Sequence, residues 1–179
     1  AVTTSTAGKA GATPGASGPH RLAMARLATA DNPAFEVDPA EVEALQASFT
    51  IVTLERLRAE LGPTRPLVLL LGVDAFLGLP TWRRWAELFD FAHIAVANRP
   101  GYALDTAQML PELARLCATR QAPAHILHGA PGGSLVQFDM TPLAISATDI
   151  RTRRAAGLSL RYLLQAPVID YISTHQLYL

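Results

Sequence analysis

Charge of either sign is scarce in this sequence, and cysteine is nearly absent. Charged residues make up 17% of the 179 residues, and 15 basic side chains balance 15 acidic ones. No global field therefore favours nucleic acid or an anionic membrane, so we expect neither as a partner. Cys117 is the single cysteine, which excludes an intrachain disulfide and is typical of a protein from a reducing cytoplasm.

Long hydrophobic runs and a leader are lacking too. The longest apolar run, 66–73, is far too short to cross a bilayer, and residues 1–19 lack the charged start and apolar core of a signal peptide. Those residues are rich in Ala, Gly, Ser and Thr, so we expect a flexible segment at 1–19. Half of the chain is apolar, which suffices for a single domain over 20–179.

Helical and strand patterns alternate from residue 20 onward. The spacing of apolar residues predicts helices at 20–30, 48–61, 81–89, 108–119, 148–156 and 166–175, and strands at 35–38, 67–73, 93–97 and 134–139. The continuous apolar run at 67–73 is typical of a strand buried on both faces. The alternation predicts an α/β domain with a mainly parallel sheet and flanking helices. Ligands of such sheets bind at the carboxyl ends of strands.

Two segments that follow predicted strands carry polar groups suited to a nucleotide. Gly72 would let a ligand approach the backbone, and Asp74 could accept hydrogen bonds from a ribose or a metal-bound water. Arg99 could make paired contacts with a phosphate. The alternatives are a turn with a capping Asp74 and a solvated loop arginine.

Two tryptophans, Trp82 and Trp85, lie between Asp74 and Arg99. Thr81 is a candidate N-cap for the expected helix at 81–89, which would place Trp82 in its first turn. An indole at the ligand edge can stack on a planar ring. Trp85, one turn further on, is expected to pack in the core. For Trp82, a place in the core is the open alternative.

Two expected helix starts could hold an anion. The first N–H groups of a helix lack intrahelical hydrogen-bond partners, so they can donate to a ligand at the helix N-terminus. Ser146 and Thr148 precede one helix and Arg151 falls in its first turn, a combination suited to phosphate. Thr50 is a candidate N-cap of another helix, whose first amides could receive a small carboxylate. Ordinary capping by Thr148 beside a solvent-facing Arg151 is the alternative.

The order and spacing of these segments resemble the nicotinate-nucleotide adenylyltransferase family from about His20 to the C-terminus. The matching segments are His20–Met24, Ser48–Thr50, Gly72–Asp74, Leu79–Trp82, Arg99–Gly101, Ile145–Arg151 and Leu177–Tyr178. The resemblance implies a Rossmann-like nucleotidyltransferase fold. It also implies transfer of the adenylyl group of ATP to nicotinate mononucleotide, with Mg²⁺. The products would be nicotinate adenine dinucleotide and pyrophosphate, a step of NAD biosynthesis.

The resemblance also implies roles for individual residues. The nicotinate mononucleotide would be held by Thr50, Trp82 and Arg99, with Trp82 stacked on the ring and the Thr50 region at its carboxylate. The ATP site would comprise Gly72, Asp74, Ser146, Thr148 and Arg151. Arg151 would be catalytic, because it stabilises charge at the reacting phosphorus and the departing pyrophosphate. No protein nucleophile is needed, since the phosphate of the mononucleotide attacks.

The sequence departs from the family pattern in three places. The family opens with a strand and a Gly-Thr-Phe-Asp-Pro-x-His-x-Gly-His turn, and no such motif occurs here. With the N-terminal strand or strands missing, we expect exposed apolar residues on the remaining sheet. Phe49 stands where Tyr is usual, and Val52 where Asp is usual. His125 and His128 form a His-x-x-His pair without a third ligand, so no protein metal site is expected.

These departures leave three hypotheses. The first is the adenylyltransferase itself, with its N-terminal part omitted or lost. The second is a catalytically degenerate homologue that binds nucleotide without turnover. The third is another adenylyltransferase of the superfamily, such as a pantetheine-phosphate adenylyltransferase; Trp82 and the Ser146 to Arg151 segment favour the first over the third.

Overall fold

The computed structural model describes residues 2–3, 15–44, 49–98, 109–141 and 143–179. Its contacts divide the chain into two compact units, although the sequence suggests one domain over 20–179. Unit 1 comprises Ala1–Ser48 and Leu143–Leu179, and unit 2 comprises Phe49–Pro142. Each unit is described by itself below.

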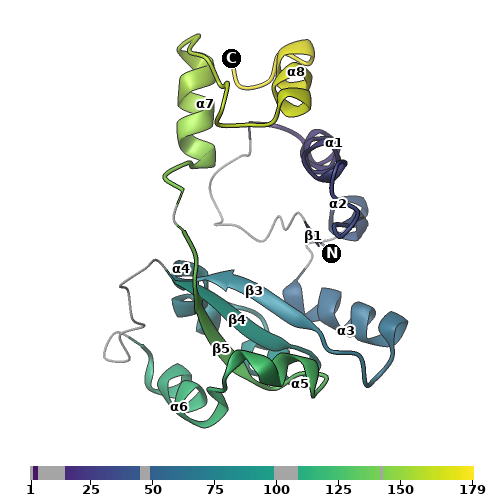
Figure 1. Cartoon of the computed structure of the whole chain (residues 1–179), viewed down its shortest axis with the longest axis vertical. Coiled ribbons are helices and arrows are strands. Elements are labelled where there is room, and N and C mark those ends of the chain that lie inside the picture. Colours follow the sequence, from purple (N-terminus) through teal and green to yellow (C-terminus); the bar gives the residue numbers. More distant parts are fainter. Residues whose placement is uncertain (1, 4–14, 45–48, 99–108, 142) are drawn as a thin grey trace. The chain divides into compact units, whose positions relative to one another are not determined.

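A parallel sheet forms the centre of unit 2. Strands β3 (Val68–Gly72), β4 (His93–Asn98) and β5 (Leu135–Asp139) pair in the order β3-β4-β5. Figure 1 shows them as neighbouring arrows that point the same way. Gly72 lies opposite Ala97 and Asn98 opposite Asp139, so the carboxyl ends of all three strands meet at one edge. The predicted α/β class and parallel sheet are confirmed.

The strands of this sheet differ in burial. Five of the six residues of β4 are buried, because both faces of this central strand are covered. In β3 the exposed fraction alternates, with Val68 39% and Leu70 66% exposed while Leu71 is buried. The prediction that 67–73 is buried on both faces is therefore wrong, since only one face of β3 is covered. The expected exposure of apolar residues on the sheet is seen here.

Helices and 3-10 turns pack around this sheet. They are α3 (Thr50–Leu61), α4 (Val73–Leu77), η1 (Leu79–Thr81), η2 (Trp85–Glu87), α5 (Leu88–Phe91), α6 (Pro111–Arg120) and η4 (Ala124–His128). Except for η4, they contribute apolar side chains to one core with the strands, which includes Ile51, Phe76, Leu79, Leu88 and Leu113. Helix α3 ends where Gly62 adopts φ 85°, a conformation that glycine adopts readily.

The continuous helix predicted at 81–89 is wrong. The chain instead forms η1, a break, η2 and α5. The break comes at Arg84, whose left-handed backbone (φ 52°, ψ 38°) cannot continue a right-handed helix. Pro80 lies within η1 rather than at the start of a longer helix.

Unit 1 is mainly helical. Its helices are α1 (Gly18–Thr29), α2 (Ala40–Glu43), α7 (Ala147–Ala155) and α8 (Ala166–Thr174), and β1 (Val2–Thr3) pairs in parallel with β2 (Val37–Asp38). A second core contains Ala16, Ile150, Leu160, Val168, Ile172 and Leu177. The segment expected to be flexible, 1–19, includes β1, the buried Ala16 and the start of α1; its residues 4–14 lie outside the described part.

Helices α1 and α8 are joined by an aromatic cluster. His20 Nδ1 lies 3.0 Å from the Tyr171 hydroxyl, and the rings of Tyr171 and His175 lie 4.1 Å apart. The motif around His20 therefore serves packing within unit 1. Within the described ranges, no helix has the length and hydropathy needed to span a bilayer.

Candidate functional site

The carboxyl end of β3 presents an open stretch of backbone. Gly72 is exposed, and a Cβ atom placed on it would meet nothing within 4 Å. A ligand can therefore approach its backbone closely, as the sequence suggests. Asp74 lies in the first turn of α4 with an exposed side chain. It does not cap α4, because Gly72 is the N-cap and no side-chain cap bond forms.

Asn98 is a residue at this edge to which the sequence analysis assigns no role. It ends β4 and is only 5% exposed. Its Nδ2 donates to Gln137 Oε1 at 3.2 Å, whereas its Oδ1 is buried without a hydrogen-bond partner among the residues the structure describes. A buried acceptor at a ligand edge is suited to a donor from a ligand or water. An amide that ends a continuous apolar strand is the signal that could have identified it.

Trp82 lies directly after η1 and is half-buried against the main core. Its backbone N–H donates to the Leu79 carbonyl at 2.8 Å, which fixes the turn. Trp85 packs partly against the same core. The prediction that Thr81 caps a helix is wrong, because Thr81 ends η1 and its hydroxyl donates to the Gly78 carbonyl at 2.8 Å.

The N-terminus of α3 supplies backbone donors. Phe49, with extended backbone, is the N-cap, and its carbonyl accepts from the N–H groups of Val52 at 2.9 Å and Thr53 at 3.2 Å. Thr50 is thus the first helical residue rather than the predicted cap. The N–H groups of Thr50 and Ile51 lack an intrahelical partner, as the first amides of any helix do. Val52, where the family has Asp, is 49% exposed.

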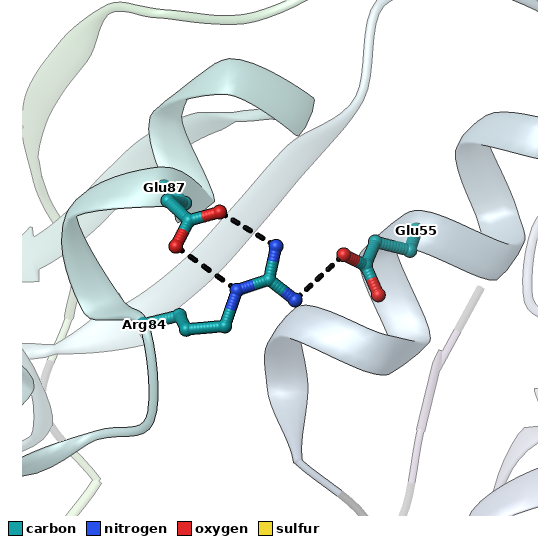
Figure 2. Close-up of polar contacts among 3 residues, drawn as sticks. All are labelled: Glu55, Arg84 and Glu87. Carbon is teal, nitrogen blue, oxygen red and sulfur yellow. Dashed lines mark hydrogen bonds and ion pairs between the residues drawn. The ribbon is translucent and has the colours of Figure 1, made fainter.

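An arginine connects α3 with the segment that carries both tryptophans. Arg84 Nε and Nη2 donate to the two carboxylate oxygens of Glu87 at 2.9 and 2.6 Å, and Nη1 donates to Glu55 of α3 at 2.8 Å. Figure 2 shows the guanidinium between the two carboxylates. The hydrogen bonds from Arg84 lower the pKa of Glu87 and, reciprocally, those carboxylates raise the pKa of Arg84.

The start of α7 in unit 1 carries the residues predicted to bind phosphate. Ser146 is the N-cap, and its Oγ accepts from the Asp149 N–H at 3.0 Å. Thr148, the cap in the alternative interpretation, instead accepts from Arg151 Nη2 at 3.2 Å. Asp149 pairs with Arg153 at 3.0 Å, so its charge is compensated along the helix. The structure therefore brings Ser146, Thr148 and Arg151 together in one exposed turn.

The predicted residues thus fall into two groups. Thr50, Gly72, Asp74 and Trp82 belong to unit 2, and the α7 group belongs to unit 1. Arg99 lies outside the described residues.

The histidines of unit 2 do not form a site. His125 and His128 lie in η4, and no cluster of three or more potential metal-ligating side chains occurs within the described ranges. His93 is fully buried; its Nε2 lies 2.8 Å from the Ala130 carbonyl, and its Nδ1 accepts from the Ser134 N–H at 3.1 Å. Both ring nitrogens of His93 are therefore occupied by backbone partners.

Comparison with known proteins gives consistent matches. Residues 1–153 match the cytidylyltransferase-like family model. A "Probable nicotinate-nucleotide adenylyltransferase" of Dechloromonas aromatica is 53% identical over 159 residues, covering 88% of this chain and 73% of that protein. One with the same name from Aeromonas salmonicida is 46% identical over 167 residues, covering 93% and 77%.

A solved structure shares the fold. It is the Plasmodium falciparum nicotinic acid mononucleotide adenylyltransferase complexed with APC, with a TM-score of 0.60 and 15% identity over 89% of this chain and 75% of that one. A second structure of that enzyme, complexed with NaAD, gives a TM-score of 0.56. These similarities confirm the Rossmann-like nucleotidyltransferase fold.

Proposed function

The chain belongs to the nicotinate-nucleotide adenylyltransferase family, and on that basis we propose that it transfers the adenylyl group of ATP to nicotinate mononucleotide. The products are nicotinate adenine dinucleotide and pyrophosphate, in NAD biosynthesis. The observation that carries the proposal is the half-buried Trp82, which lies in the segment that contacts α3 and its N-cap through Arg83 and Arg84. The cation of the neighbouring Arg83 lies 4.9 Å from the ring centre of Phe49, the residue that caps α3.

The mononucleotide is recognised by groups of unit 2. The indole of Trp82 offers a face for stacking on the nicotinate ring. The N–H groups of Thr50 and Ile51 donate to its carboxylate, which the positive end of the α3 dipole also favours. Arg99 contacts the mononucleotide as a cation. Val52 is uncharged, so it adds no repulsion toward the carboxylate.

The family resemblance assigns ATP contacts to Gly72 and Asp74 of unit 2 and to Ser146, Thr148 and Arg151 of unit 1. The open backbone at Gly72 admits the nucleotide, and Asp74 accepts hydrogen bonds from the ribose. Ser146, Thr148 and Arg151 bind the phosphates at the start of α7, where the unpaired amides and the guanidinium favour an anion. The Asp149–Arg153 ion pair supports this assignment, because it removes an uncompensated negative charge from the same turn.

Catalysis consists of positioning and charge stabilisation. The phosphate of nicotinate mononucleotide attacks the α-phosphorus of ATP, a bond to that phosphorus forms, and the bond to the departing pyrophosphate breaks. Arg151 is the catalytic residue, since its cation offsets charge on the pentacoordinate phosphorus and the leaving group. Mg²⁺ bound to the ATP phosphates would offset their charge, and Asp74 would accept hydrogen bonds from its bound water.

The cysteine content and the net charge of the chain bear on its location and its partners. The single cysteine is buried, which supports a cytoplasmic location, and the balanced charge supports small nucleotides rather than nucleic acid as partners.

The alternative is a homologue that binds nucleotide without turnover. In that case nicotinate mononucleotide still binds at unit 2, and only the transfer step is lost.

Release of pyrophosphate from ATP, Mg²⁺ and nicotinate mononucleotide tests the reaction. We expect release that depends on the mononucleotide, and a lower rate in Arg151→Ala that extra nicotinate mononucleotide does not restore. Equal ATP kinetics in Arg151→Ala would contradict the phosphate assignment. Mononucleotide binding without release would select the binding homologue.

A further inference from the structure

The segment that carries Trp82 contacts α3 and its N-cap through two adjacent arginines, Arg83 and Arg84. The guanidinium of Arg83 lies over the ring of Phe49, 4.9 Å from its centre. Arg84, the next residue, donates to Glu55, one helical turn into α3. Trp82 immediately precedes both arginines, so its backbone is held against the N-terminal half of that helix.

The backbone of Arg84 adopts an energetically unfavourable conformation. Its φ of 52° is uncommon for any residue other than glycine. The conformation turns the side chain so that one guanidinium reaches Glu87 with two nitrogens and Glu55 with the third. Such paired contacts hold a guanidinium in a fixed plane, which a lysine cannot reproduce.

We propose that Arg84 is a positioning residue of the mononucleotide site, which it serves by fixing the Trp82 segment to α3 through Glu55. The indole face and the unpaired amides of Thr50 and Ile51 must lie at a set separation if one ligand is to contact both. Arg84 maintains that separation before the ligand binds. The inference rests on the proposed function, because it assigns the ring to Trp82 and the carboxylate to α3.

If Arg84 had only a structural role, its loss would lower the global stability of the fold. The side chains of Arg84, Glu55 and Glu87 are 39%, 37% and 46% exposed, and ion pairs this exposed contribute little to global stability. Their loss should therefore leave the unfolding midpoint nearly unchanged. Pre-organisation of a binding site is sensitive to much smaller displacements, so the loss should appear in mononucleotide affinity.

Helix α3 offers a matched control. Glu60 forms an exposed ion pair with Arg56 at 2.8 Å, four residues apart on the same helix. Glu55→Ala and Glu60→Ala thus remove the same group from one helix, but only Glu55 reaches the Trp82 segment. Neither changes the backbone at Arg84. Arg84→Ala is the second test variant.

Two measurements on the full chain separate the possible outcomes. Acrylamide quenching in a Trp85→Phe background reports the accessibility of Trp82 without ligand, and calorimetric titration gives the dissociation constants of nicotinate mononucleotide and ATP. In Glu55→Ala we expect faster quenching and about 5-fold weaker mononucleotide binding, the upper range for an exposed ion pair. We expect unchanged ATP affinity in Glu55→Ala and no change of any kind in Glu60→Ala.

Unchanged quenching and unchanged mononucleotide affinity in both Glu55→Ala and Arg84→Ala would overturn the proposal, as would equal effects in Glu60→Ala. Failure of the unsubstituted chain to bind nicotinate mononucleotide would instead overturn the proposed function. The quenching comparison would still decide whether Arg84 fixes the Trp82 segment.

Discussion

His93 shows how a residue of a reactive type can be committed to structure. Its two ring nitrogens contact the Ala130 carbonyl and the Ser134 N–H, so His93→Ala removes the partners of both groups and leaves a cavity at a fully buried position. We expect a loss of about 2–4 kcal/mol in unfolding free energy, measured by urea denaturation. His125→Ala, at an exposed position, should change it by less than about 0.5 kcal/mol. Equal stability of the two variants would contradict the assignment.

Cys117 is protected by its surroundings. It is buried, its sulfur lies 3.7 Å from the sulfur of Met109, and desolvation by burial raises the pKa of its thiol. The thiolate is the reactive form, so a raised pKa keeps the thiol protonated at neutral pH. We expect iodoacetamide to label the native protein slowly at pH 8 and the urea-unfolded protein rapidly. Rapid native labelling would show that the thiol is open to solvent.

At the scale of elements, α7 depends on one cap. Ser146 Oγ accepts from the Asp149 N–H, so Ser146→Ala should lower the unfolding free energy by about 1 kcal/mol. Thr148→Ala should cost less, because Thr148 accepts only from the exposed Arg151. Chemical denaturation of the two variants measures the difference, and a larger loss in Thr148→Ala would indicate the wrong cap.

Elements with strong local patterns could be predicted from the sequence. The helix at α3 and the strand at β4 carry their apolar spacing within a few residues, so their type was evident. The break at Arg84 was not, because the contact that its side chain makes is with Glu55, 29 residues earlier in the chain. The choice between Ser146 and Thr148 as cap also depends on geometry, since both hydroxyls precede the helix.

At the scale of the whole molecule, β3 has one covered and one uncovered face in the described structure. Leu70→Lys, on the exposed face, should change the unfolding free energy by less than about 0.5 kcal/mol. Leu71→Ala, one residue on and buried, should cost about 2–4 kcal/mol. Urea denaturation measures both, and a large loss in Leu70→Lys would show that this face is covered in solution.

The candidate site could be predicted in part at this scale. Motif order identified the family, and the comparisons confirm it. The exposed turn at Ser146, Thr148 and Arg151 was predictable because a helix start carries its own donors. The role of Arg84 was not predictable, since it depends on a contact with a residue distant in the sequence. The amino-acid composition does not indicate the division into two units.

Calorimetric titration of nicotinate mononucleotide into the chain and into Trp82→Ala tests the central claim most directly. The account predicts saturable binding to the unsubstituted chain and about 10-fold weaker binding to Trp82→Ala, since stacking on an aromatic ring contributes about 1–3 kcal/mol per base. The absence of binding, or equal affinity in the two proteins, would contradict it.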